Sequence, residues 1–218
     1  KLAPVIHALR TSGAGRIEVC DTGQHPHLAG PLLKWFGIRV NHRLRLMSDG
    51  QSLSRLSSKA LDRAGRLVSK TKPDLIVCQG DTSTAMMVGL AAYYQQVPLA
   101  HIEAGLRTWD RLQPYPEEVN RRLLSLVAGL HFAPTRAAAR NLHTEKIPPE
   151  AVTVTGNTSI DALLWTIRRL RRRPLSRREF EPSVRQLLGT DKPKFVIVTA
   201  HRRESFGPRI RKIGDAIR

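Results

Sequence analysis

Three acidic residues in the middle of the chain have positions that suit acid–base catalysis. Asp81 and Glu103 each follow a short apolar run, and Glu117 stands where a helical pattern begins. Carboxylates that converge can move protons and stabilise developing positive charge, and their crowding raises the proton affinity of at least one. A pure phosphate binder gains nothing from three converging acids. The set therefore favours an enzyme over a binding protein.

Alternating strand-like and helical patterns must position these acids. Apolar runs are followed by helical patterns, which is typical of a parallel α/β sheet. In such sheets, ligands lie at the carboxyl ends of the strands. The strands are predicted at 16–22, 75–78, 98–102, 131–133, 152–154 and 195–199. Helices are predicted at 1–10, 28–36, 51–69, 83–95, 116–130, 135–145, 159–170 and 181–188, and 40–49 is expected to be irregular. We therefore expect Asp81, Glu103 and Glu117 to face one crevice.

A second polar cluster follows the last predicted strand. His201 and Arg202 stand in a loop between a strand and a helix, where helix amide groups add to basic side chains and form an anion site. We expect the chain to divide into an N-terminal Rossmann-like domain (1–158), a linker helix with an arginine-rich linker (159–180) and the start of a second Rossmann-like domain (181–218). Glu118, beside Glu117, is interpreted as a helix-start carboxylate that matches the helix dipole.

The composition restricts the class of protein. The chain has 218 residues, of which 41% are hydrophobic, enough for a packed core. It has two cysteines, Cys20 and Cys78, both in apolar runs, so we expect two small buried side chains and a reducing cytoplasm. No apolar run approaches the length that spans a membrane, and no secretory leader is recognisable. We expect no membrane partner.

The net charge is unusually positive. Lys and Arg total 36 against 18 Asp and Glu, for a formal charge of +18, and seven arginines fall between 168 and 180. Such a field attracts polyanions. No aromatic interleaving or RNA-binding signature accompanies the charge, so we interpret the arginine run as a solvated helix face and linker rather than a nucleic-acid site.

A series of motifs resembles a known family. In chain order the sequence contains QGDTST, HIEAGLRT, PYPEEVNRR, FAPT, VTGNTSIDALLW and VTAHRRESFG. Together they are similar to the non-hydrolysing UDP-N-acetylglucosamine 2-epimerases. The resemblance implies the two-domain GT-B fold and a homodimer. The sequence contains no GxGxxG fingerprint, Walker loop or CxxC metal pattern, so we expect no cofactor or metal. Neither the family's first strand and Gly-Thr-Arg-Pro-Glu loop nor most of its second domain is found, so we expect the chain to be a fragment.

The resemblance also implies roles for individual residues. Asp81, Glu103, Glu117 and His201 match catalytic positions of the family. The residues that match substrate contacts are Lys1, Asp81, Glu103, His201 and Arg202. Gln24 and His25 match a turn that, in bacterial members, helps to bind a second, regulatory UDP-sugar.

The implied reaction interconverts UDP-N-acetylglucosamine and UDP-N-acetylmannosamine. UDP is eliminated to leave a 2-acetamidoglucal, and UDP then adds back with the proton on the opposite face. Three alternatives share the motifs: a hydrolysing epimerase, an epimerase of a related UDP-diacetamido sugar, and an inactive homologue or fragment. A regulator that binds UDP-sugar without catalysis is an alternative outside the class. Outside this class, a polyanion-binding protein would bind in a salt-dependent and sugar-independent way.

Overall fold

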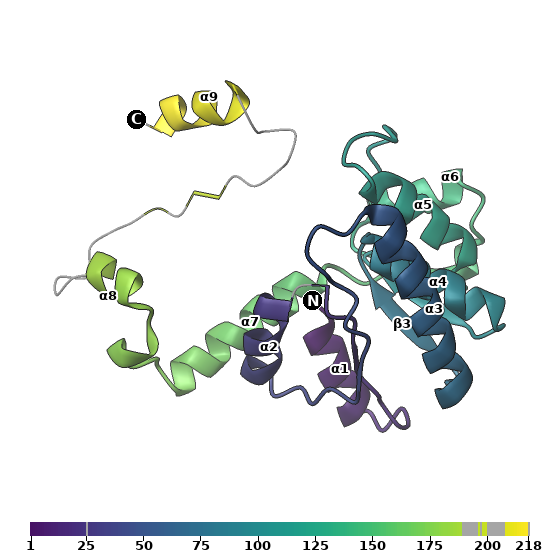
Figure 1. The fold of residues 1–218 in the computed structure, drawn as a ribbon, viewed down its shortest axis with the longest axis horizontal. Helices are drawn as coiled ribbons and strands as arrows, with labels where there is room; N and C mark the ends of the chain where they lie inside the picture. Colours follow the sequence, from purple (N-terminus) through teal and green to yellow (C-terminus); the bar gives the residue numbers. More distant parts are fainter. Residues whose placement is uncertain (25, 189–195, 197, 200–207, 218) are drawn as a thin grey trace. The chain divides into compact units, whose positions relative to one another are not determined.

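A computed structural model describes residues 1–24, 26–188, 196, 198–199 and 208–217 (Figure 1). It divides into two compact units, Lys1–Arg169 and Leu170–Arg218. The sequence-based domain limits of 158 and 180 remain a prediction.

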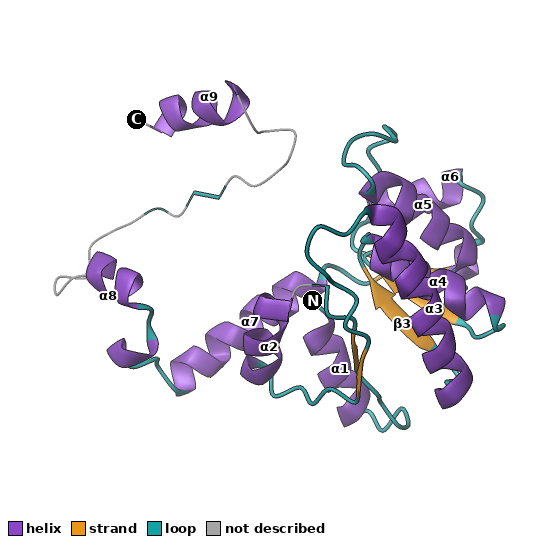
Figure 2. Ribbon diagram, in the orientation of Figure 1, coloured by secondary structure: helices purple, strands orange, loops and turns teal. Residues whose placement is uncertain are grey.

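The first unit contains a four-stranded parallel sheet, and strands are drawn in orange in Figure 2. Its strands pair in the order β3-β4-β5-β6, and their bounds are β3 Ile76–Gln79, β4 Leu99–Ile102, β5 Leu130–Ala133 and β6 Val152–Val154. All pairs are parallel. Every residue of β4 is buried, as expected for a parallel strand covered on both faces. The four carboxyl ends therefore lie along one edge of the sheet. The expected α/β class with a parallel sheet is confirmed.

Four helices accompany the strands, and hydroxyl side chains cap the starts of α3, α4 and α6. The helices are α3 Leu53–Thr71, α4 Ser83–Tyr94, α5 Glu117–Val127 and α6 Arg136–Thr144. Ser52, Thr82 and Thr135 each accept a hydrogen bond from a backbone amide three residues ahead, which satisfies a donor that the helix leaves unpaired. The patterns that predicted these four helices are confirmed to within a few residues.

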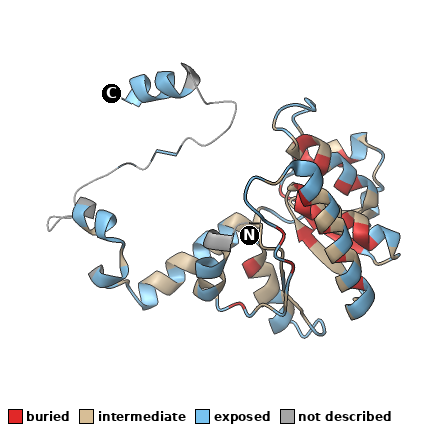
Figure 3. Ribbon diagram, in the orientation of Figure 1, coloured by how far each residue is buried: buried red, intermediate tan, exposed pale blue. Residues whose placement is uncertain are grey.

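Small side chains let α3 and α4 pack closely. Leu56, Ala60, Ala64 and Val68 recur every four residues along α3 and form its buried face. On its other side α4 packs against α5, where a β-carbon at Gly89 would lie 2.8 Å from a methyl of Leu124. The buried residues gather around the sheet and these helices, as Figure 3 shows.

An N-terminal layer precedes this sheet. It contains α1 (Leu2–Thr11), the parallel pair β1 (Cys20–Asp21) and β2 (His42–Arg43), and α2 (Pro26–Trp35). The strand expected at 16–22 has only two strand residues, and the segment expected to be irregular contains β2. Cys20 is exposed, so the expectation that it is a buried side chain is wrong, whereas Cys78 is buried.

Helix α7 (Thr158–Arg172) is anchored in the first unit by its tryptophan. The Trp165 ring lies 4.8 Å from the ring of Phe36 and is stacked on His7 at 5.9 Å between centroids. The guanidinium of Arg169 lies 4.8 Å from the ring centroid of Trp35, a cation–π contact. A one-turn helix, η1 (Pro149–Ala151), leads into β6.

The second unit is described only in part. It contains η2 (Arg177–Glu179), α8 (Pro182–Leu188) and α9 (Pro208–Ile217). Of the strand predicted at 195–199, residues 196, 198 and 199 are described, and these three are not in a strand. Across the described residues, no helix is both long enough and apolar enough to span a membrane.

Candidate active site

The carboxyl ends of β3 and β4 bring the first two predicted acids together. Gln79 pairs with Ile102 in the sheet, so the residues that follow each strand are neighbours. Gly80 has φ +81°, and a β-carbon there would lie 3.8 Å from Oε2 of Glu103. Glu103 itself has φ +68°, a left-handed conformation that is unusual for a residue other than glycine. Such backbone strain is typical of functional sites.

Glu103 is the centre of a hydrogen-bonded cluster that joins distant parts of the chain. Lys1 Nζ donates to both carboxylate oxygens, at 2.7 and 2.8 Å. The side-chain amide of Gln79 donates to Oε2, and that of Asn157 donates to Oε1 at 3.4 Å. The Glu103 side chain is 12% exposed, so these contacts form in a largely dry site where they are stronger than in water. The predicted substrate-binding Lys1 thus lies in direct contact with a predicted catalytic acid.

Asp81 is held by helix α5. Arg121 donates to Oδ2 of Asp81 through Nε at 2.9 Å and Nη2 at 2.6 Å. Asn120 donates its side-chain amide to the Asp81 carbonyl at 2.8 Å and to Ser83 Oγ at 3.2 Å. These contacts join the start of α4 to the first turns of α5.

Glu117 is the first residue of α5 and has no neutralising partner among the residues that the structure describes. Its Oε2 is buried without a hydrogen-bond partner there. Residues three and four positions apart share a helix face. Glu117 therefore lies on the α5 face that carries Asn120 and Arg121, the two residues that hold Asp81. That Glu117 borders the same crevice as Asp81 and Glu103 remains a prediction.

Glu118 differs from its interpretation as a simple helix-start carboxylate. Its side chain is fully buried. Oε2 accepts the backbone N–H of Thr108 at 3.0 Å, and Oε1 accepts that of Trp109 at 3.1 Å. Arg121 Nη1 donates to Oε2 at 3.2 Å. Glu118 therefore secures the loop after β4, a role that depends on long-range contacts and that local sequence could not indicate.

Two further residues of the HIEAGLRT segment have buried side chains and make specific contacts. His101 Nε2 donates to the Gly80 carbonyl at 2.8 Å, and burial lowers the pKa of His101 to about 4. The Arg107 side chain is fully buried and forms a two-pronged ion pair with Glu145, at 2.8 and 2.6 Å. Sequence reasoning missed both roles. The signal that could have found them is a histidine and an arginine within an apolar strand-and-turn motif.

Four predicted residues remain, and most of them fall outside the part of the chain that the structure describes. His201 and Arg202 lie outside the described residues, as does His25. Gln24 is half-buried in the turn after β1. Their assignments remain predictions.

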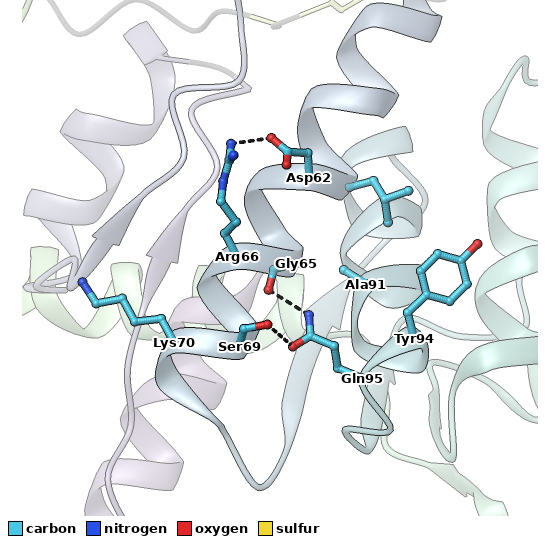
Figure 4. Close-up of a pocket in the computed structure, with 9 residues that line it drawn as sticks. Asp62, Gly65, Arg66, Ser69, Lys70, Ala91, Tyr94 and Gln95 are labelled. Carbon is cyan, nitrogen blue, oxygen red and sulfur yellow. Dashed lines mark hydrogen bonds and ion pairs between the residues drawn. The ribbon is translucent and has the colours of Figure 1, made fainter.

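A surface groove of about 640 Å³ lies elsewhere, between α3 and α4 (Figure 4). Several of its polar groups pair with one another: Gln95 donates to the Gly65 carbonyl, Ser69 donates to Gln95, and Arg66 pairs with Asp62. None of the predicted site residues lines it. Among the described residues, no group of three or more His, Cys, Asp and Glu side chains is arranged to hold a metal ion.

Comparison with known proteins identifies the family. The family model described as UDP-N-acetylglucosamine 2-epimerase matches residues 7–218. A protein of Ralstonia solanacearum, named "Probable UDP-N-acetylglucosamine 2-epimerase", is 43% identical over 213 residues, which are 98% of this chain and 56% of that protein. The chain thus spans little more than half the length of the curated relatives it matches.

Solved structures agree with the sequence comparison. The crystal structure of UDP-GlcNAc 2-epimerase from Neisseria meningitidis bound to UDP-GlcNAc is 41% identical, with a TM-score of 0.75 over 78% of this chain and 47% of that one. The Methanocaldococcus jannaschii enzyme in complex with UDP-GlcNAc and UDP is 30% identical, with a TM-score of 0.80 over all of this chain and 58% of that one. Structural neighbours of this kind have the GT-B-like fold expected from the sequence. The chain belongs to the UDP-N-acetylglucosamine 2-epimerase family.

Proposed function

We propose that the protein to which this chain belongs interconverts UDP-N-acetylglucosamine and UDP-N-acetylmannosamine. The observation that carries the proposal is the cluster around Glu103. It joins Lys1, Gln79 and Asn157, from three separate parts of the chain, at the carboxyl edge of the sheet. Parallel sheets bind ligands at this edge. The proposed sugar-nucleotide substrate rests on family membership, and the proposed proton transfer rests on the acidic residues.

The proposed reaction needs proton carriers and charge stabilisation. Breaking the bond between carbon 1 of the sugar and the phosphate oxygen builds positive charge on the ring, while carbon 2 gives its proton to a base. UDP leaves, a 2-acetamidoglucal remains, and the reverse addition returns a proton to the opposite face. We assign Asp81, Glu103 and Glu117 to this proton transfer and charge stabilisation. Lys1, beside Glu103, is assigned to the substrate.

Further assignments rest on family resemblance. His201 and Arg202 are proposed to stabilise the departing diphosphate, and Gln24 and His25 to contact a regulatory UDP-sugar. We propose that the enzyme is a homodimer and acts in the cytoplasm. Cys20 and Cys78, the two cysteines of this chain, are not joined in a disulfide, which suits a reducing compartment.

The test is an exchange experiment on the complete protein encoded by the gene. Incubation with UDP-N-acetylglucosamine in deuterated water should introduce deuterium at carbon 2 and yield UDP-N-acetylmannosamine, both followed by proton NMR. Glu103→Gln removes the charge that holds Lys1 and should lower the exchange rate about 10²–10⁴-fold. Glu150→Gln, at an exposed position in η1, is the matched control and should exchange at the wild-type rate.

Each of the alternative functions predicts a different result in this experiment. Free N-acetylmannosamine with UDP would indicate a hydrolysing epimerase. Exchange with a UDP-diacetamido sugar alone would indicate that substrate instead. Binding of UDP-N-acetylglucosamine without exchange would contradict the proposed function and indicate a regulator. Binding that is sugar-independent and falls steeply with salt would indicate a polyanion-binding protein.

A further inference from the structure

We propose that Arg121 is a positioning residue that orients Asp81 for the reaction, and that Glu118 fixes Arg121 in place. The inference rests on the proposed function, because it concerns the residue through which Asp81 acts. Neither Arg121 nor Glu118 needs to touch the substrate for this role.

The geometry around Asp81 supports an orienting role. Arg121 approaches with two nitrogens, Nε at 2.9 Å and Nη2 at 2.6 Å, and both donate to the same oxygen, Oδ2. Arg121 makes no hydrogen bond to the other oxygen, Oδ1, which the proposal assigns to the substrate. The Arg121 side chain is 14% exposed and that of Asp81 is 29% exposed. A pair this sheltered keeps a defined geometry better than a surface ion pair does.

A second anion holds the other side of the guanidinium. Arg121 Nη1 donates to Glu118 Oε2 at 3.2 Å, and Glu118 is fully buried. The backbone N–H groups of Thr108 and Trp109 fill further acceptor positions on Glu118. A buried carboxylate is tolerated when it is paired and hydrogen-bonded, and Arg121 supplies its positive charge. Glu118 thus links the loop after β4, through one guanidinium, to the acid after β3.

The residue type matters as much as the charge. Arginine presents donors in a rigid planar fork, and here the fork spans two carboxylates. Lysine has a single ammonium group on a flexible stem and cannot reproduce three donors in that plane. Arg121→Lys should therefore keep the charge next to Glu118 but lose the orientation of Asp81.

The experiment measures kcat, KM and melting temperature on the complete protein, with UDP-N-acetylglucosamine as the substrate. The variants are Arg121→Lys, Arg121→Gln, Asp81→Asn and the double variant Arg121→Lys/Asp81→Asn. Arg122→Gln, on the same helix and 45% exposed, is the matched control and should keep wild-type kcat. Arg121→Lys should lower kcat about 10²-fold with little change in KM, because misplacement of a reacting group by about 1 Å has that effect. The double variant should be no slower than Asp81→Asn alone, because Arg121 acts through Asp81.

Two results would overturn the proposal. Arg121→Lys could retain wild-type kcat, or its loss could persist undiminished in the Asp81→Asn background, which would indicate direct contact with the substrate. If Arg121→Gln unfolds because Glu118 is left unpaired, Arg121→Gln/Glu118→Gln removes both charges and should fold while remaining slow. An inactive wild-type protein would instead contradict the proposed function. The melting temperatures would then decide whether Arg121 holds Asp81. If it does, the double variant should lose less melting temperature than the two single variants lose together, and a fully additive loss would contradict the contact.

Discussion

At the scale of single residues, neighbours in sequence have different environments. Glu117 and Glu118 adjoin each other at the start of α5. Glu118 is buried and accepts hydrogen bonds from two backbone amides and Arg121, whereas Glu117 has a buried oxygen without a described partner. A satisfied, buried carboxylate stabilises a structure, whereas an unpaired one is a candidate for chemistry, the role we propose for Glu117. Glu117 and Glu118 are the same residue type, so the difference between them lies in the groups that they contact.

The buried His101 should make the stability of the protein depend on pH. Burial lowers the pKa of His101 to about 4, so the folded protein holds it neutral while the unfolded chain binds a proton near pH 6.5. Its contribution to stability is therefore complete above about pH 6.5 and is lost as the pH falls towards 4. The melting temperature should fall over this range, and His101→Gln should make the fall shallower.

The control for this pH series is His143→Gln, which removes an exposed histidine and should keep the wild-type slope. Burial also lowers the pKa of His131, which pairs with His101 across β4 and β5, so part of the slope should remain in His101→Gln. An unchanged slope in His101→Gln would show that His101 is not held neutral by the fold.

At the scale of elements, the turn after β4 must pass close to α6. Gly105 has φ +83°, and a β-carbon there would lie 2.2 Å from the Ala138 carbonyl oxygen. Backbone atoms of a packed helix cannot move aside cheaply, so only glycine fits. Asn141 of α6 also donates to the Gly105 carbonyl at 2.9 Å. The approach fixes the base of the turn that carries Glu103.

Gly105→Ala should therefore destabilise the protein more than the same change at Gly156. Gly156 has nearly the same conformation, φ +82°, but open space around its α-carbon. Gly156→Ala should cost about 1 kcal/mol for the left-handed backbone alone. Gly105→Ala should cost several kcal/mol more, because the helix must shift. Urea unfolding measures both, and equal losses would show that α6 does not constrain this turn.

At the scale of the whole molecule, the chain has two units of unequal packing. The first, Lys1–Arg169, contains both sheets and the buried clusters. The junction at 169–170 falls within α7 and is followed by arginines, of which Arg171, Arg172, Arg173 and Arg178 are exposed. Protease cleavage concentrates where exposed backbone has few packing contacts.

Brief digestion of the 218-residue chain with trypsin should therefore cut first between residues 171 and 178. A resistant fragment of residues 1 to about 172 should accumulate, identified by mass spectrometry. Arg63, whose guanidinium donates to backbone carbonyls of Leu44 and Arg45, should be cut later. Early cleavage at Arg63 would contradict the division into these units.

The local sequence predicted much of the central sheet but less of the N-terminal layer. The runs at 75–78 and 98–102 correspond to β3 and β4. They could be predicted because buried parallel strands are continuously apolar, and such a run is recognisable from local sequence alone. The pair β1–β2 has two residues in each strand and leaves Cys20 exposed. Strands this short are defined by their pairing partner, so periodicity could not locate them.

The sequence by itself determined the α/β class, the family, and the carboxyl-edge positions of Asp81 and Glu103, because apolar periodicity and motif order are local properties of the chain. Only the tertiary structure decided which groups hold these acids. The partners of Glu103 include Lys1 and Asn157, and the partner of Asp81 is Arg121, residues separated from the acids by 40 to 102 positions. Such ion pairs and hydrogen bonds act over about 3 Å in space, and sequence separation carries no information about which residues the fold brings that close.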